Sequence, residues 1–376
     1  MTAPGVDALT ADRTVLLVVP VSNLAGVARH VIDLMRVGVP GWQLTVAAPE
    51  GPLLDEVRSL PRARSGVSAV PVAIEPAEGD RPGVRTDLAV RRLRSLVREM
   101  RPAIVHSHLA RADLLAAMAT VGLPPRLVST EHHIPPDRFM FHSTPARART
   151  MEAIHHLRLR RFRGLVAVSD STRRDMVRWW HPTQPVRVIL NGVDRRRASP
   201  RPEPGLRFLS LTRLSPEKNV EMSVRAFARI AGMHPEATLT VAGAGECLPA
   251  LRGLAADLGV ADRVSFPGFV DADQAMASHD VVLQPSKSDN CSYTLLDAVS
   301  EGMGVAASPI GGNPEILPDH CIAALDDLDG FVAVALEQAL RPDRRPTLPA
   351  RVPTVVGMAA QLSDVYDRVM RGERAA

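Results

Sequence analysis

Lysine is almost absent from this chain of 376 residues: among its 45 basic residues, only Lys218 and Lys287 are lysine. A compact ammonium group on a flexible stem differs chemically from the planar guanidinium of arginine. Both lysines fall in loops at the expected edges of sheets. Each is therefore a candidate for a site that needs a point charge, with a chance surface position as the alternative.

Cysteine and aromatic residues are also scarce. Cys247, Cys291 and Cys321 fit neither a paired disulfide framework nor a metal-ligand spacing, which favours a reducing compartment. Aromatic residues make up 3% of the chain and offer few surfaces on which bases stack. No nucleic-acid-binding motif is present, so we expect no nucleic acid as a partner.

Long apolar runs are missing too. The segment from Met1 to Arg13 is polar and shows no signal peptide. The apolar run after Thr14 is interrupted by charged or polar side chains at Arg29, His30 and Asp33, too soon to span a bilayer. We expect a cytoplasmic protein, either free in solution or peripheral at the inner face of the cell membrane.

The net charge of +4 conceals an asymmetry along the chain. Residues 1–200 contain 29 arginines and no lysine against 18 acidic residues, whereas the remainder contains 16 basic and 23 acidic residues. The two halves therefore face different partners. The basic half suits an anionic surface or an anionic acceptor.

Repeated strand, loop and helix patterns predict an α/β fold with two doubly wound sheets. The length favours two domains. A stretch rich in proline and arginine, Arg195 to Gly205, has no apolar periodicity and indicates the boundary. We expect domains at 1–195 and 204–345, and we expect the last helix, 353–371, to pack back on the first domain.

Histidines follow two successive strands of the first domain, as the pairs His106/His108 and His132/His133. Because adjacent positions on an extended strand face opposite ways, we expect at most one histidine of each pair to face a given site. On this argument we predict no metal site. The basic helix 146–163 either packs by its apolar stripe or lies on an anionic membrane surface.

The second domain contains charged loops where its strands are expected to end. Arg213 and Lys218 are five positions apart before a helix, an arrangement that suits a diphosphate. Asp289 and Asp297 frame a polar loop and suit the hydroxyl groups of a sugar, with an acidic helix face as the alternative. The loop at Gly268 would then hold a base.

Five segments in this order resemble the retaining glycosyltransferases of family 4, also called group 1. The segments are Arg213-Leu214-Ser215-Pro216-Glu217-Lys218, Gly243-Ala244-Gly245, Phe266-Pro267-Gly268, Asp289 to Asp297, and Gly311-Gly312-Asn313-Pro314-Glu315. The resemblance implies the GT-B fold, in which two Rossmann-like domains flank a cleft. It also implies that the second domain holds a nucleotide-sugar and the first domain holds the acceptor.

The resemblance implies roles for individual residues. Arg213 and Lys218 match the residues that neutralise the diphosphate, and Asp297 matches the carboxylate on the ribose. The catalytic set is His132, Arg213, Lys218 and Asp289. The donor-binding set is Gly26, Gly268, Asn290, Cys291, Ser292 and Asp297. No metal and no cofactor are implied beyond the nucleotide-sugar co-substrate.

Two features depart from the family pattern. Aspartate stands at Asp289 and Asp297 where glutamate is usual, which keeps the charge and shortens the reach by one methylene. A single glycine, Gly26, stands where many members have two.

The predicted activity is retaining transfer of a hexose-type sugar to a hydroxyl of a glycan, glycolipid or natural product, in cell-surface polysaccharide biosynthesis. A nucleotide-sugar epimerase and a non-catalytic nucleotide-sugar-binding protein are the alternatives.

Overall fold

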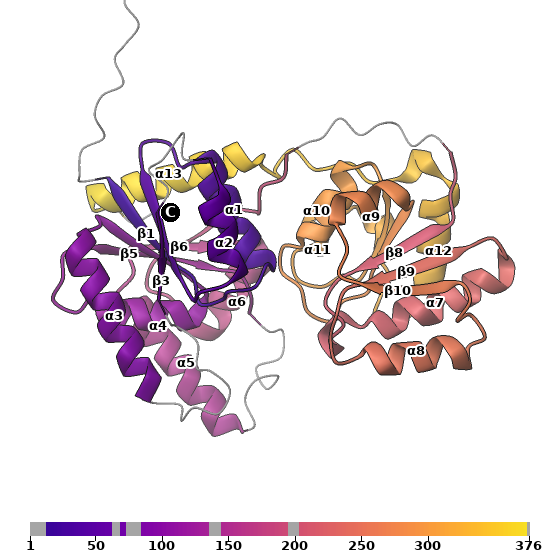
Figure 1. Ribbon diagram of the computed structural model, residues 1–376, viewed down its shortest axis with the longest axis horizontal. Helices are drawn as coiled ribbons and strands as arrows, with labels where there is room; N and C mark the ends of the chain where they lie inside the picture. Colours follow the sequence, from indigo (N-terminus) through magenta and orange to yellow (C-terminus); the bar gives the residue numbers. More distant parts are fainter. Residues whose placement is uncertain (1–12, 62–67, 73–83, 135–143, 195–202, 374–376) are drawn as a thin grey trace, which may run out of the picture. The chain divides into compact units, whose positions relative to one another are not determined.

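The computed structural model describes residues 13–61, 68–72, 84–134, 144–194 and 203–373, and it divides the chain into two units (Figure 1). The first unit consists of Met1–Gly192 and Val355–Ala376, and the second of Val193–Thr354. Most of the predicted boundary segment, Arg195 to Gly205, lies outside the described residues.

A seven-stranded sheet forms the centre of the first unit, with the order β3-β2-β1-β4-β5-β6-β7 and parallel pairing throughout. Its strands are β1 (Thr14–Val18), β2 (Gln43–Ala48), β3 (Ser68–Pro71), β4 (Ile104–His108), β5 (Arg126–Glu131), β6 (Gly164–Ala167) and β7 (Val186–Val188). The order reverses between β1 and β4. In parallel sheets this reversal opens a crevice at the carboxyl ends of the strands, where ligands bind.

Helices cover both faces of this sheet, which explains why its strands are apolar on both sides. They are α1 (Gly26–Val37), α2 (Pro52–Ser59), α3 (Val84–Met100), α4 (Leu109–Ala119), α5 (Pro145–Leu159), α6 (Asp170–Asp175), the π-helix η1 (Met176–Trp180) and α13 (Val355–Arg371). Side chains of β1 alternate between two cores: Val15 and Leu17 pack with α1, α2 and α13, whereas Leu16 and Val18 pack with α3 and α4. Figure 1 shows α3, α4 and α5 together on one side of the sheet.

The final helix, α13, completes the core of the first unit although the whole second unit precedes it in the sequence. Its Tyr366 is fully buried, and the ring lies 5.4 Å from the Trp42 ring. The Ser363 hydroxyl donates to the Pro40 carbonyl at 2.7 Å. These contacts fix α13 against the loop before β2.

The second unit has a five-stranded parallel sheet with the order β10-β9-β8-β11-β12. Its strands are β8 (Arg207–Leu211), β9 (Thr238–Ala242), β10 (Val264–Gly268), β11 (Val281–Gln284) and β12 (Gly304–Ala307). Its helical segments are η2 (Pro216–Lys218), α7 (Val220–Met233), α8 (Leu248–Asp257), α9 (Ala272–Ser278), α10 (Tyr293–Ser300), α11 (Asn313–Ile316), η3 (Asp319–Cys321), α12 (Leu328–Leu340) and η4 (Pro342–Arg344). The main core of this unit gathers Phe227, Leu251 and Phe331 from α7, α8 and α12.

The two parallel sheets confirm the predicted α/β class with two Rossmann-like domains. The order again reverses in the second sheet, between β8 and β11. Within the described ranges, no helix is long and apolar enough to cross a membrane.

The packing of α13 predicts a contrast between two identical substitutions on one helix. Val365 is fully buried and Val356 is 61% exposed. Val365→Ala removes two buried methyl groups and leaves a cavity, so we expect it to lower the free energy of unfolding by about 2 kcal/mol. All three tryptophans belong to the first unit, so urea unfolding followed by tryptophan fluorescence measures this change. Val356→Ala is the matched control, and equal losses in the two variants would contradict the packing of α13.

Candidate functional site

Glycines bring the loops of the second unit into contact at the carboxyl edge of its sheet. A Cβ at Gly243 would lie 1.9 Å from the Thr212 carbonyl oxygen, and one at Gly245 would lie 2.2 Å from that of Leu214. Both glycines have positive φ, which other residues rarely adopt. The Leu214 amide then donates to the Ala244 carbonyl at 2.8 Å. The glycine pair therefore sets the position of the loop after β8.

That loop places Lys218 beside Asp289. The Lys218 ammonium lies 2.9 Å from Asp289 Oδ2, and both side chains are mostly buried, at 17% and 14% exposed. The Gln284 side-chain amide donates to the same oxygen at 3.1 Å, and the Asn290 backbone amide donates to Asp289 Oδ1 at 3.0 Å. Hydrogen bonds to a charged group are stronger than neutral ones. The Asp289 carboxylate is therefore held in one orientation.

Gly311 fixes the backbone of the same residue. A Cβ at this position would lie 1.6 Å from the Asp289 carbonyl oxygen, and φ is +58°. Only glycine allows so close an approach. The Gly311-Gly312 motif thus packs the loop after β12 directly under the loop that carries Asp289.

The remaining predicted donor residues lie around this loop. Ser292 caps α10 by accepting from the Leu295 amide at 3.3 Å, and its hydroxyl donates to the Gln284 side chain at 3.1 Å. Asn290 and Cys291 are buried, and Asp297 is half-buried on α10. At the end of β10, Gly268 accepts from the Gly243 amide at 2.7 Å through its carbonyl.

Arg213 differs from Lys218 in its surroundings. Its side chain is 65% exposed and pairs with Glu217 at 3.1 Å. Glu217 also accepts from the Ser215 hydroxyl at 2.6 Å. The two predicted cations thus have separate carboxylate partners.

The other lysine, Lys287, has an exposed side chain. Its backbone amide donates to the Glu217 carbonyl at 2.7 Å. With Ser215 and Asn219 it lines a pocket of about 440 Å³, which Arg213, Lys218 and Asp289 do not line.

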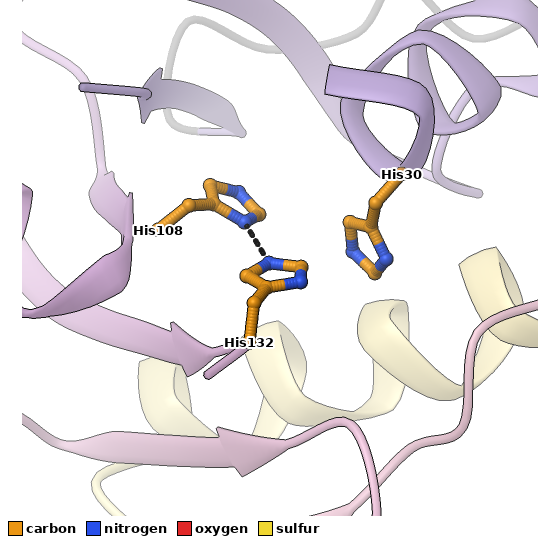
Figure 2. Close-up of side chains that lie close together, drawn as sticks. All are labelled: His30, His108 and His132. Atoms are coloured by element: carbon orange, nitrogen blue, oxygen red, sulfur yellow. Dashed lines mark hydrogen bonds between the residues drawn. The ribbon is translucent and has the colours of Figure 1, made fainter. Parts of the chain in front are cut away.

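The first unit gathers histidines at the corresponding edge of its sheet (Figure 2). His132 follows β5 and is 9% exposed, and its Nε2 lies 2.9 Å from His108 Nδ1 at the end of β4. His30, on α1, brings its ring centroid within 4.8 Å of that of His132. Gly26, the predicted phosphate-loop glycine, is exposed at the start of the same helix.

The expectation that only one histidine of each pair faces a given site is wrong for His106 and His108. These residues are two positions apart, so they share one face of β4, and their ring centroids are 4.5 Å apart. His106 is bonded at both nitrogens, to the Tyr366 hydroxyl at 2.7 Å and the Thr130 hydroxyl at 2.8 Å. Sequence reasoning also missed His30, whose only signal is its place one turn into the helix after β1.

Burial keeps the four imidazoles neutral at neutral pH. It lowers the pKa of His30 to about 4 and that of His106 to about 3. Burial also lowers the pKa of His108 and of His132 well below the ordinary value of 6.5. A neutral imidazole offers one donor and one acceptor nitrogen. His132 is therefore placed as a neutral hydrogen-bonding group rather than as a cation.

These pKa shifts predict that the first unit loses stability in mild acid. The unfolded chain takes up protons near pH 6.5 and the folded one does not, so stability is present above pH 6.5 and falls as the pH drops towards 4. Glu131 acts in the opposite sense because burial raises its pKa to about 8, but one carboxyl opposes four imidazoles. We expect the free energy of unfolding to fall by at least about 2 kcal/mol between about pH 7.5 and about pH 5. Urea titration followed by tryptophan fluorescence measures it, and an unchanged midpoint would be inconsistent with four buried neutral rings.

Comparison with curated proteins gives partial matches. The glycogen synthase of Mycobacterium tuberculosis is 29% identical over 241 residues, which are 61% of this chain and 57% of that protein. A GDP-mannose-dependent alpha-(1-6)-phosphatidylinositol monomannoside mannosyltransferase of Mycolicibacterium smegmatis is 29% identical over 174 residues, 40% of this chain and 46% of that protein. The match thus spans about half the length of these relatives.

Solved structures share the fold over nearly the whole chain. A glycosyltransferase from Rickettsia africae has a TM-score of 0.74 at 15% identity, covering 96% of this chain and 99% of its own. The HepE protein of Anabaena, solved in complex with UDP and glucose, has a TM-score of 0.69 at 16% identity, covering 95% and 98%. At this level of identity the likeness shows the GT-B fold.

Two family models match adjoining parts of the sequence. The model described as Glycosyltransferase Family 4 matches residues 24–197, and the model described as Glycosyl transferases group 1 matches residues 194–332. The second match contains Lys218, Asp289 and Asp297, and the first contains His132. Together the two matches span most of the chain, which therefore belongs to the group 1 glycosyltransferases.

Proposed function

We propose that this protein transfers a hexose-type sugar, with retention, from a nucleoside diphosphate to a hydroxyl of a glycan, glycolipid or natural product. Cell-surface polysaccharide biosynthesis is the proposed setting. The observation that carries the proposal is the Lys218–Asp289 pair, held at 2.9 Å among loops that meet at the carboxyl edge of the second sheet. In open α/β sheets ligands bind at this edge.

In the proposed reaction the anomeric carbon–oxygen bond of the donor breaks and negative charge develops on the diphosphate. Lys218 and Arg213 neutralise that charge, and electrostatic stabilisation of this kind usually contributes more to the rate than any other effect. The side-chain cations thereby take the role that a metal ion takes in other transferases, which makes this step metal-independent. The acceptor oxygen bonds the anomeric carbon on the leaving-group face, and its proton passes to a departing phosphate oxygen.

The donor is held by polar groups of the second unit. Asp297 accepts hydrogen bonds from the ribose, and the loop at Gly268 receives the base. Asp289, fixed by Lys218 and the Gln284 amide, lies beside the transferred sugar. Asn290, Cys291 and Ser292 complete the donor loop. HepE, with its UDP and glucose, supports a nucleotide-sugar as the donor.

The first unit supplies the acceptor side. His132 is buried and neutral, so it exchanges hydrogen bonds with a sugar hydroxyl instead of repelling the cationic character of the anomeric carbon. Gly26, exposed at the start of α1, lets the backbone approach the donor phosphates. These roles need no further cofactor.

We expect Lys218→Ala to lower turnover by roughly 100-fold or more, because it removes a group that stabilises charge in the transition state. Arg213→Ala should act in the same direction. Release of nucleoside diphosphate from a panel of nucleotide-sugars, with and without acceptor sugars, measures turnover. Lys287→Ala is the matched control, since it removes the other lysine and leaves the Asp289 cluster intact.

The same panel separates the competing functions. Transfer that survives Lys218→Ala unchanged would refute the diphosphate site. Interconversion of the sugar without any transfer would identify an epimerase. A thermal shift with a nucleotide-sugar that never yields free nucleotide, even with water as acceptor, would identify a binding protein.

We also propose that α5 lies on an anionic membrane surface, which makes the protein peripheral at the inner face of the cell membrane. Ile154 and Leu157 on this helix are 36% and 65% exposed. Exposed arginines flank them: Arg147, Arg149 and Arg160. A helix that combines exposed apolar side chains with arginines suits the boundary between anionic headgroups and acyl chains.

Vesicle sedimentation tests this location. Binding should require anionic lipid and weaken with added salt. We expect Leu157→Ala to reduce it about fivefold, the factor for losing about 1 kcal/mol of apolar burial. Leu340, 41% exposed on α12, provides the control variant Leu340→Ala. Binding that ignores salt and lipid charge would rule the proposal out.

A further inference from the structure

Three imidazoles from separate elements converge in the first unit. His30 comes from α1, His108 from the end of β4, and His132 from the residue after β5 (Figure 2). They are 3%, 0% and 9% exposed. One ring nitrogen from each lies within 4.8 Å of the others. Such a convergence of ligand atoms in the interior is what a metal site requires.

The hydrogen bonding of His30 leaves a lone pair in the cluster. Its Nδ1 lies 3.0 Å from Asn191 Oδ1, a carbonyl oxygen that only accepts, so Nδ1 carries the ring proton. Its Nε2 is then an acceptor, and it is buried without a hydrogen-bond partner among the described residues. Figure 2 shows the His30 ring beside that of His132. A buried acceptor without a partner costs stability, which a bound cation would recover.

His108 contributes its other nitrogen, Nδ1, to the cluster. Its Nδ1 lies 2.9 Å from His132 Nε2, while its Nε2 is buried and has no partner within the described part of the chain. Two imidazole nitrogens that face each other share one proton between them. A cation that replaced this shared proton would bind both rings, and the proton would move to the other nitrogen of its ring.

We propose that His30, His108 and His132 bind one divalent transition-metal ion of the zinc type. Zinc is held by histidine nitrogens at about 2.0–2.1 Å, which places tetrahedral ligands roughly 3.4 Å apart. The His108–His132 pair is already close to this spacing, and His30 needs to approach by roughly 1.4 Å at most. Three neutral nitrogen ligands and no carboxylate favour zinc, copper, nickel or cobalt over magnesium or calcium.

Asn191 completes the site as a positioning residue. Histidine ligands usually donate their second nitrogen to a carbonyl or carboxylate, which fixes the ring and its tautomer. The Asn191 side chain does this for His30. His132 belongs to both this proposal and the proposed transferase site, but the tests below measure metal binding and not transfer, so the two proposals can fail separately.

Metal binding to the full-length, tag-free protein tests the site. After treatment with chelator, titration with Zn²⁺ in a calorimeter should show one ion per chain, and Co²⁺ should give the intense visible absorption of tetrahedral nitrogen coordination. We expect His30→Gln to weaken binding at least about 100-fold. Asn191→Ala should weaken it about 10-fold or more, the range for a residue that orients a ligand.

His106 provides the matched control. It is buried beside His108, but both of its nitrogens already have partners, so His106→Asn should keep the ion. Zn²⁺ should also raise the unfolding temperature reported by tryptophan fluorescence in the wild type and in His106→Asn, because a ligand of the folded state stabilises it. His234→Gln controls for a partly exposed histidine of the second unit.

Three outcomes would overturn the proposal. The first is absence of saturable Zn²⁺ binding. The second is binding that His30→Gln and Asn191→Ala leave unchanged. The third is an equal loss of Zn²⁺ affinity in His30→Gln and in a folded His106→Asn. If His30→Gln does not fold, the Zn²⁺ affinities of Asn191→Ala and His106→Asn test the proposal: equal affinities in these two variants would overturn it.

Discussion

Parallel strand pairing is the constraint on which both candidate sites depend. A parallel sheet is covered by helices on its two faces, so its strands are apolar and its polar residues gather at the ends of the strands. In the first sheet His108 ends β4 and His132 follows β5, and in the second Gln284 ends β11. Within each sheet all strands run the same way, so the groups at their carboxyl ends meet at one edge even when they are far apart in the sequence. The sites are thus a consequence of the direction in which the strands hydrogen bond.

Burial then decides how these polar groups behave. In the first unit, Asp113 accepts from the Ser107 hydroxyl at 2.5 Å and the Ser129 hydroxyl at 2.7 Å, and it pairs with Arg158. Arg158 also lies 3.4 Å from Glu131, so it connects α5 to β5. A buried charge left without its partner is strongly destabilising. This network and the neutral histidines therefore hold the strand ends in one arrangement beside the site.

The sequence predicts what local patterns determine. Apolar runs, glycine turns and loop charges are local, and they are enough for the two α/β sheets and for the loops of Lys218, Asp289 and Gly311. Partners distant in sequence are harder to foresee: Gln284 marks only the end of a strand in the sequence, although its amide holds Asp289. His30 interrupts an apolar run, and its meeting with His132 depends on how α1 packs on the sheet. The expectation that His106 and His108 face opposite ways is wrong because they are two positions apart, and residues two apart on a strand share a face.

The connectivity of α13 has a consequence for the order in which this protein matures on the ribosome. The second unit, Val193–Thr354, is complete before the chain has reached Val355, so it can fold while the first unit still lacks a helix. Until α13 emerges, the apolar side chains that it covers, including Trp42 in the loop before β2 and Val166 on β6, stay open to solvent. The nascent chain thus exposes an apolar surface of the first unit for the whole time that residues 193–354 are translated. That interval is the one in which chaperones at the ribosome would have an apolar target on this polypeptide.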